Sequence, residues 1–445
     1  MTTYATTRTG WTFPLTLPRV VLLLLAVAAF GILAWRFYAG LGASTNLRDD
    51  FPWGLWIGLD ILTGVALAAG GFTMAFYIEV IGRERFHQFL RPAVLTAFVG
   101  YILVTMGILG DVGLPWRIYH PIYLWNPRSF MFEVAWCVML YTTVLFVEFL
   151  PMPLERLGLT RLLGMVRTVM PVFIVLGIVL STLHQSSLGS LFLLMGHRLH
   201  PLWWSPILPV NFLLTAICVG FAMVVFESIL SGWLLKHPLD GKLLGDLTRP
   251  LPWLLLGALA VRLGDLVVRG SLSAVTEGSL QSYSFLVEVS IGLALPALLL
   301  FSRSWRETPG CLFTIATMVV IGVVLNRVNV SIIGMFTETS SYVPAWSEWV
   351  VSVGLVALGV LAVVFISENM PVRNDHHHAD YSVSRLGCIL NPSESTASGG
   401  ETPSGSTVSG VNLRRSSLRK ALWGRRTAME DWRSQSPGNE DQIRR

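Results

Sequence analysis

Side chains that bind polar groups and exchange protons stand together in one otherwise apolar stretch. The segment STLHQSSLGSL, residues 181–191, follows the apolar run PVFIVLGIVL and places His184, Gln185, Ser186 and Ser187 side by side. Imidazole exchanges protons near neutral pH, and amides and hydroxyls donate or accept hydrogen bonds. The stretch therefore predicts a site that binds a polar group and moves protons in an apolar environment.

Further ionisable residues stand inside apolar runs, where a charge at mid-bilayer costs about 2.5–3.5 kcal/mol. They are Asp60, Asp111, Glu133, Arg262, Asp265, Glu288, Arg327 and Glu348. Structural explanations stay open beside functional ones. Arg262 and Asp265, three residues apart, can neutralise each other on one helix. Arg327 can pair with Glu288 or Asp265, and His184 can simply bind a neighbouring helix.

The residues also limit the cofactors. A membrane b-type haem usually needs two histidines facing each other from helices, whereas His184 is the only histidine expected well inside a helix. The four cysteines lack metal-ligand spacing. We therefore predict no haem, iron–sulfur cluster or metal in this chain. A redox role would then use a quinone, which needs hydrogen-bond donors, a titratable group and a slot for its ring. His184, nearby carboxylates, Trp53 and Trp56 could supply these.

The elements that must hold these residues are membrane helices. Hydrophobic residues make up 53% of the 445-residue chain and charged residues 13%, and the mean hydropathy is +0.60. The net charge of +5 is explained by loops and lipid headgroups, so we expect no nucleic-acid binding. Since about 20 apolar residues span a bilayer, we predict an all-α integral membrane protein with ten transmembrane helices, at 19–38, 52–78, 92–112, 130–150, 168–186, 206–230, 250–270, 283–301, 310–335 and 346–367.

Loop charges predict the orientation. With a cytoplasmic N-terminus the inner loops carry eleven Arg and Lys residues and the outer loops five, so the positive-inside rule places both termini in the cytoplasm. Most polar residues then lie in the outer half, although Asp111 and Glu348 could be interfacial. We divide the chain into a cytoplasmic segment (1–18), a membrane domain (19–370) and a disordered basic tail rich in Ser, Gly and Arg (371–445). The first apolar run could alternatively be a signal peptide, and His376–His378 could bind a metal.

Several motifs resemble one family of membrane subunits. They are FPWGLWIGLDILTGVALAAGGF (51–72), RFHQFLRPAVLTAFVGYILVTMGILGDVG (85–113), FEVAWCVMLY (132–141), STLHQSSLGSL (181–191), LHPLWWSPILPV (199–210), LNRVNVSIIG (325–334) and YVPAWSEWVVSVGLVALGVL (342–361). In this order they resemble the NrfD/polysulfide-reductase family, and most closely its ten-helix HybB-like branch, which includes the membrane subunit of hydrogenase-2. The resemblance covers roughly residues 19–367.

The resemblance implies a bacterial inner-membrane protein with two four-helix bundles plus flanking helices. It implies a menaquinone or ubiquinone bound near the outer face. It also implies a ferredoxin-like iron–sulfur subunit as electron partner, connected to a catalytic subunit or multihaem cytochrome. Helices two to five would form the first bundle, with Trp53, Asp60, Asp111, Glu133 and His184 around the quinone. Helices six to nine would form the second bundle, with Arg262, Asp265, Glu288 and Arg327.

These expectations give each residue a role. We expect His184 to bind a quinone carbonyl and transfer its proton, and Glu133, Asp111 and Asp60 to relay protons. We expect Gln185, Ser187, Trp53 and Trp56 to shape the binding site, and Arg262, Asp265, Glu288 and Arg327 to balance charge or conduct protons. The alternatives are a secondary transporter, which would bind substrate among midplane charges, and a passive membrane anchor.

Overall fold

The computed structural model describes residues 10–196, 198–235, 240–337 and 340–372. The predicted tail and His376–His378 lie outside the described residues. Within the described ranges every regular element is helical, and ten helical segments are long and apolar enough to cross a membrane. The chain is thus an all-α, multi-pass membrane protein, as the sequence predicts.

Four of the ten spans are single helices, and six contain two or more helical segments. The single helices are α1 (Leu17–Ala39), α9 (Thr160–Leu193), α10 (Leu208–Leu235) and α17 (Trp346–Asn369). The second span joins η1 (Trp56–Thr63), α3 (Gly64–Leu67), α4 (Gly70–Ala75) and η2 (Phe76–Val80). The others are η3 (Glu84–Phe89) with α5 (Leu90–Asp111), α7 (Phe130–Phe149) with α8 (Pro151–Leu157), α11 (Gly241–Leu247) with α12 (Leu251–Val268), α13 (Leu280–Val289) with η6 (Ser290–Ala294) and α14 (Leu295–Phe301), and α16 (Pro309–Ser331) with η7 (Ile333–Met335).

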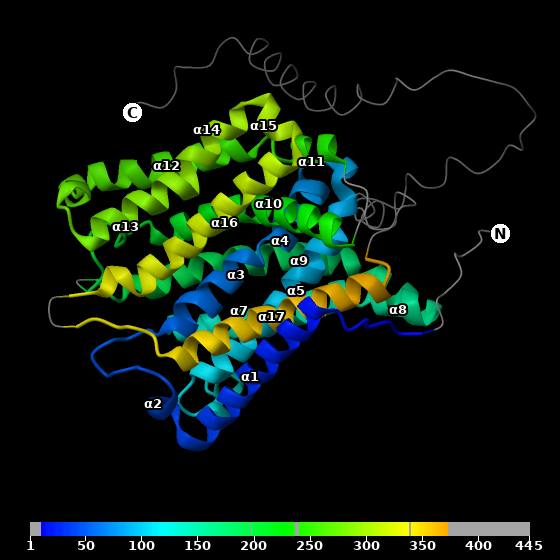
Figure 1. The fold of residues 1–445 in the computed structure, drawn as a ribbon, viewed down its shortest axis with the longest axis horizontal. Coiled ribbons are helices and arrows are strands. Elements are labelled where there is room, and N and C mark those ends of the chain that lie inside the picture. Colours follow the sequence, from blue (N-terminus) through cyan, green and yellow to red (C-terminus); the bar gives the residue numbers. More distant parts are fainter. Residues whose placement is uncertain (1–9, 197, 236–239, 338–339, 373–445) are drawn as a thin grey trace, which may run out of the picture. The chain divides into compact units, whose positions relative to one another are not determined.

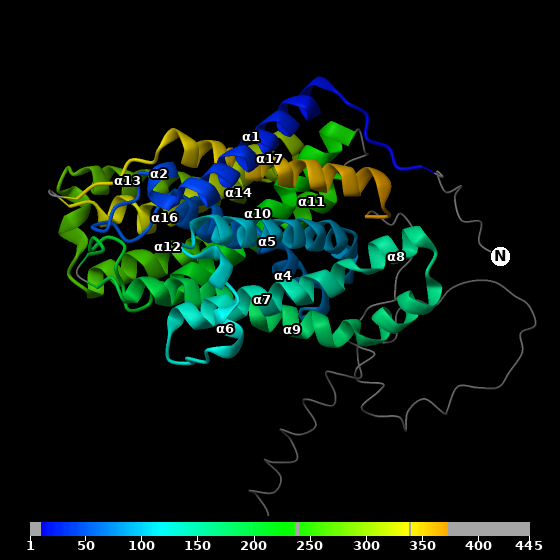
Figure 2. The same cartoon turned by 90° about the horizontal axis from the view of Figure 1, so that it is seen from below.

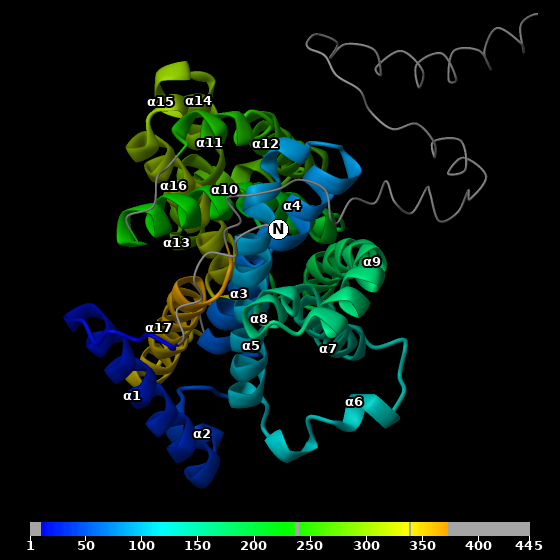
Figure 3. The ribbon, with the colours of Figure 1, turned by 90° about the vertical axis from the view of Figure 1, so that its right-hand side faces the viewer.

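The spans form two bundles with two flanking helices. One bundle consists of the second span together with α5, α7 and α9. The other bundle consists of α10, α12, α13–α14 and α16. Helix α1 lies against α17 outside both bundles. Figure 3, which looks nearly along the helices, separates these groups, and Figure 1 shows α1 beside α17. The second span also packs on α10 and α16, so it belongs to the interface between the bundles.

Helix α9 is longer than the sequence predicts, beginning at residue 160 instead of 168 and ending at 193 instead of 186. The helix contains Pro171 in its interior, as membrane helices tolerate. The polar stretch is also helical, and its hydroxyls find acceptors within the same helix, with Ser186 donating to the Thr182 carbonyl at 3.0 Å and Ser190 to the Ser186 carbonyl at 3.3 Å. His184 consequently lies about two turns before the helix end.

Small residues allow the closest helix crossing in the second bundle. A Cβ added to Gly292 on η6 would lie 2.6 Å from the Cα of Gly322 on α16. Only a pair of glycines permits this backbone approach, which is the usual route to tight helix packing in membranes.

The first and last spans are joined at the end predicted to face inward. The Thr12 backbone N–H donates to Asn369 Oδ1 at 2.8 Å, and Asn369 Nδ2 donates to the Thr12 carbonyl at 2.9 Å. Arg19 on α1 forms an ion pair with Glu368 on α17. Figure 2 shows the two helices side by side from a second direction. Helix α1 is therefore attached mainly through α17.

Candidate functional site

The polar stretch of α9 faces the interior of the first bundle. His184 is fully buried, and its Nδ1 shares a 2.8 Å hydrogen bond with the hydroxyl of Tyr101 on α5. The side-chain amide of Gln185 donates at 2.7 Å to the carbonyl oxygen of Val65 on α3. Ser187 donates to the His184 carbonyl at 3.2 Å, within its own helix. The first two bonds hold α9 to two facing helices and fix the imidazole and the amide.

Several buried polar atoms near this stretch have no hydrogen-bond partner within the described part of the chain. They include Ser181 Oγ, His184 Nε2, Gln185 Oε1 and the indole Nε1 of Trp53. The Trp53 ring, just before η1, lies 5.9 Å from the ring of Phe192, which is about two turns beyond His184 on α9. Buried polar atoms are nearly always satisfied by protein, water or ligand. These atoms therefore mark positions where a bound molecule or water can form hydrogen bonds.

A line of polar side chains continues from the imidazole through the first bundle, and beyond Tyr101 it is connected by ring packing and electrostatics and not by hydrogen bonds between its members. The Tyr141 ring on α7 packs edge-on against Tyr101, with centroids 4.6 Å apart. Tyr141 interacts electrostatically with Glu148, about two turns further along α7. Glu148 lines a small cavity of about 50 Å³ together with His87 and Arg91. The line thus reaches from the middle of the bundle to the side predicted to face inward.

Tyr101 and Tyr141 were not among the residues predicted for the site. A usable signal was present, because each is a tyrosine inside a predicted membrane helix, where the hydroxyl needs a polar partner. Both are buried, Tyr101 on α5 and Tyr141 on α7, and these two helices pack against each other in the first bundle.

Two of the predicted carboxylates lie toward the flanking helices instead. Asp60 on η1 accepts a 2.7 Å hydrogen bond from Ser352 on α17. Asp111, the last residue of α5, interacts electrostatically with Arg36 on α1. The Arg36 guanidinium also donates at 2.5 Å to the Val112 carbonyl. Asp60 and Asp111 also interact electrostatically with each other. These carboxylates form a polar group where α1, η1, α5 and α17 meet.

Glu348 in the first turn of α17 organises the neighbouring loop. Its carboxylate accepts hydrogen bonds from the Tyr342 hydroxyl and from the backbone N–H of Ala345 at 2.7 Å and Asn46 at 3.1 Å. The Trp56 indole donates to the Glu348 carbonyl at 3.2 Å. Burial raises the pKa of the Tyr342 phenol well above its usual value, and the bond to Glu348 acts in the same direction. Tyr342 therefore stays protonated and joins the loop to α17.

The structure thus separates residues that the sequence predicted around one ligand. His184, Gln185 and Ser187 lie inside the bundle with Trp53 above them, whereas Asp60, Asp111 and Trp56 lie toward α17. Glu133 is exposed in the first turn of α7. No hydrogen bond or ion pair among the described residues joins His184 to any of the three carboxylates. Their joint action on one ligand stays a prediction.

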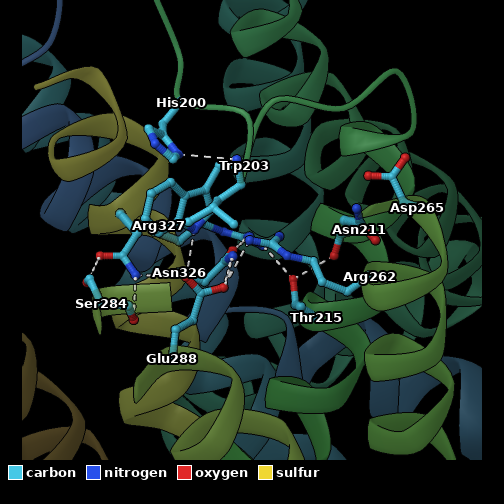
Figure 4. A network of polar contacts seen from close by, with 12 residues as sticks. His200, Trp203, Asn211, Thr215, Arg262, Asp265, Ser284, Glu288, Asn326 and Arg327 are labelled. Carbon is cyan, nitrogen blue, oxygen red and sulfur yellow. Dashed lines mark hydrogen bonds and ion pairs between the residues drawn. The ribbon is translucent and has the colours of Figure 1, made fainter. Parts of the chain in front are cut away.

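A second polar network fills the middle of the other bundle (Figure 4). Glu288 Oε1 accepts from Arg262 at 3.2 Å and from Asn326 at 2.7 Å. Its Oε2 accepts from the Trp203 indole at 2.8 Å and from Asn329 at 2.7 Å. Glu288 is 3% exposed. This single buried carboxylate accepts hydrogen bonds from donors on α12, on α16 and in the loop before α10.

The pairing of Arg262 differs from one expectation. Arg262 does not neutralise Asp265 but pairs with Glu288, while Asp265 forms a 2.8 Å ion pair with Arg269 one turn along the same helix. Residues three apart on a helix are close enough to pair, but Arg262 points into the bundle toward Glu288 (Figure 4), and Asp265 is held by Arg269. Arg269 was not considered as a partner for Asp265.

Arg327 is held mainly by neutral groups. Its guanidinium donates to Asn326 Oδ1 at 2.6 Å, to the Phe212 carbonyl at 3.0 Å and to Thr215 Oγ1 at 3.1 Å, and it lies 3.7 Å from the centroid of the Phe212 ring. The expected direct pair with Glu288 or Asp265 is absent from the ion pairs of the described residues; Asn326 instead bridges Arg327 to Glu288.

Comparison with known proteins gives the family. Residues 43–339 match the family model described as polysulphide reductase, NrfD. The chain is 34% identical to the probable Ni/Fe-hydrogenase 2 b-type cytochrome subunit of Escherichia coli over 80% of this chain and 94% of that protein. It is 27% identical to the integral membrane subunit of menaquinone reductase from Nitratidesulfovibrio vulgaris, over 77% and 90% of the two chains. It is 28% identical to the putative dimethyl sulfoxide reductase membrane subunit of Halobacterium salinarum, over 81% and 92%.

Proposed function

The chain belongs to the polysulphide reductase, NrfD family, and from that premise we propose that it is the quinone-reactive membrane subunit of a respiratory redox complex. Its relatives include membrane subunits of reductase and hydrogenase complexes, one of them named for menaquinone. The observation that carries the proposal is the pair of unsatisfied buried atoms on adjacent α9 residues, His184 Nε2 and Gln185 Oε1.

The two atoms suit the two redox forms of a quinone. When the Tyr101 hydroxyl donates to His184 Nδ1, the ring proton sits on Nε2 and can donate to a quinone carbonyl. Gln185 Oε1 can accept from a quinol hydroxyl, since the other end of its amide is held by Val65. The Trp53 ring packs against Phe192, about two turns beyond His184 on α9, and offers an aromatic surface on that side of the site. Bound there, the quinone supplies the two-electron chemistry, while this chain binds it and handles its protons.

The protons have two candidate routes. One runs through Tyr101 and Tyr141 to Glu148 and the cavity beside His87, toward the predicted inner side. The other uses Asp60 and Asp111, with Glu133 at the surface, toward the predicted outer side. The second bundle balances its buried charges through Arg262, Glu288 and Arg327, with Asp265 held by Arg269. The inward route would conduct protons to a quinone, and the outward route would release them from a quinol.

We further propose an inner-membrane location with both termini in the cytoplasm, and a ferredoxin-like iron–sulfur subunit docked on the outer side, next to a catalytic subunit or multihaem cytochrome. Although the Escherichia coli relative is named a b-type cytochrome subunit, we propose no haem in this chain. A membrane b-type haem usually needs two histidines that face each other from helices, and within the described spans only His184 lies well inside a helix.

The His184→Ala variant tests the proposal in the purified complex. Loss of a positioned acid–base group should lower quinone-linked turnover about 10²-fold or more, while reduction of a soluble dye by the catalytic partner stays unchanged. The matched control is His120→Ala, in the loop between α5 and α7. Wild-type quinone turnover in the His184→Ala complex would overturn the site and favour a passive anchor.

A further inference from the structure

A long groove runs along one face of α17, outside the first bundle. Its volume is about 1210 Å³, and its walls come from α17, α5, α10 and the η1–α3 part of the second span. The lining residues of α17 include Ser352, Val356, Val360, Val363 and Ser367 and continue to Met370. At a rise of 1.5 Å per residue, the groove follows α17 for about 27 Å, most of a hydrocarbon layer.

The volume and walls suit a long aliphatic chain. Between Ser352 and Ser367, the lining residues of α17 are all Val, Leu or Gly. Drug-sized ligands occupy about 300–1,000 Å³, so this groove takes a larger molecule. Its length and aliphatic wall match a membrane lipid lying parallel to α17.

The polar groups in the groove select among lipids. Asp60 and Ser352 form a bonded pair at one end, and Thr96 donates to Glu227 at 2.5 Å deeper inside. A third carboxylate, Asp240, lies at the other end, and no Lys or Arg occurs among the described lining residues. A phosphate headgroup would meet carboxylates without a cation to bind it, which is unfavourable. Hydroxyl groups, by contrast, can donate to carboxylates.

The groove is distinct from the site inside the first bundle. Asp60 and Thr63 of the second span line it, whereas the carbonyl of Val65 in the same span binds Gln185 on the other side. His184, Gln185 and Ser187 are not lining residues. A molecule in the groove would therefore lie about one helix diameter, roughly 10 Å, from the His184 site.

We propose that this groove is a second binding site for the quinone pool and takes the quinol, with a hydroxyl donating to Asp60 and the isoprenoid chain along the valine face of α17. The inference rests on the proposed function, because that function supplies the quinol. The groove would hold one molecule beside the site where another reacts. No electron or proton transfer is assigned to it.

The test fills the groove without touching the first site. Val360→Trp places an indole in the groove, and Val27→Trp makes the same change on the lipid-facing surface of α1, where Val27 is 60% exposed. Quinone-pool molecules bound per purified complex are counted by mass spectrometry. We expect one fewer in Val360→Trp than in Val27→Trp, and a severalfold higher apparent KM for long-chain quinol, with the KM for a short-chain analogue unchanged.

Equal counts in the two variants would overturn the second site, as would a phospholipid displaced from the groove by Val360→Trp. If Val360→Trp raised the apparent KM for the short-chain quinol as much as for the long-chain quinol, the substitution would have damaged the reaction site, and this result would also count against the proposal. The proposed function is tested by a different measurement. If it is wrong, the His184→Ala complex keeps its full quinone turnover, whatever molecule occupies the groove.

Discussion

Replacing Glu288 by glutamine should destabilise the second bundle far more than the same replacement at the surface. Glu288→Gln keeps the size of the side chain but removes its charge and turns one acceptor oxygen into an NH₂ donor. In the wild-type protein, each oxygen of the Glu288 carboxylate accepts two hydrogen bonds. Whichever way the amide turns, two of the four buried donors would face an NH₂ group.

The magnitude follows from two overlapping losses. A buried donor left without an acceptor costs about 1–3 kcal/mol, and two donors are affected. Breaking a buried ion pair costs about 3–5 kcal/mol, because Arg262 keeps its charge without a counter-charge. The losses overlap, since Arg262 is one of the four donors. We therefore expect destabilisation on the order of 5 kcal/mol.

The assay is the thermal stability of the detergent-purified protein, followed by size-exclusion chromatography after heating. The matched control is Glu307→Gln, which removes the charge from an exposed pair with Arg303, and pairs of this kind rarely change stability measurably. Glu288→Gln should unfold at a clearly lower temperature than both the wild type and Glu307→Gln. If the two variants unfold together, the network around Glu288 does not stabilise the bundle as described.

Three further outcomes are expected. Gly322→Ala should destabilise by about 1–3 kcal/mol because its Cβ meets Gly292, whereas Gly257→Ala, with open space around it, should be neutral; equal midpoints would refute the close crossing. Tyr101→Phe should lower quinone turnover by leaving His184 Nδ1 without its partner, and Tyr119→Phe on the exposed loop should not; equal rates would exclude Tyr101 from the site. Burial lowers the pKa of His200 below its ordinary 6.5, although Glu277 opposes the shift, so the unfolded chain takes up a proton first and stability falls as pH drops below 6.5. The thermal midpoint of His200→Gln should depend less on pH in that range, and an unchanged dependence would contradict this assignment.

Hydrophobicity alone predicted the ten spans because each has to satisfy its backbone within lipid. It could not predict where α9 begins and ends, since Arg161 and Arg167 precede the apolar run and polar residues follow it in the sequence. In the structure the helix extends at both ends, and the hydroxyls of Ser186 and Ser190 donate to carbonyls of their own helix. Local patterns therefore predicted the number of helices better than their limits.

Polar partners were harder to predict than polar positions. The sequence predicted that Arg262, Asp265, Glu288 and Arg327 lie together in the second bundle, but the pairing depends on which face of each helix turns inward. Arg262 reaches Glu288 across the bundle, and Asn326 bridges Glu288 to Arg327. Such cross-helix distances come from packing angles that a single sequence does not reveal.

The close pairing of α1 with α17 sets an order of events during synthesis. Helix α1 emerges first, but the helix that covers it emerges last. At roughly 5–20 residues per second, residues 40–345 take on the order of 15–60 s to translate. During that time α1 must remain in the bilayer without α17, its main partner, and only earlier segments such as α5 and the second span can pack against it. The apolar sequence of α1 is compatible with this prolonged exposure to lipid. Even in the complete fold, only 17% of its most apolar 18-residue segment is buried inside the protein. The arrival of α17, with Glu368 for Arg19 and Asn369 for Thr12, would then complete the assembly of the membrane domain.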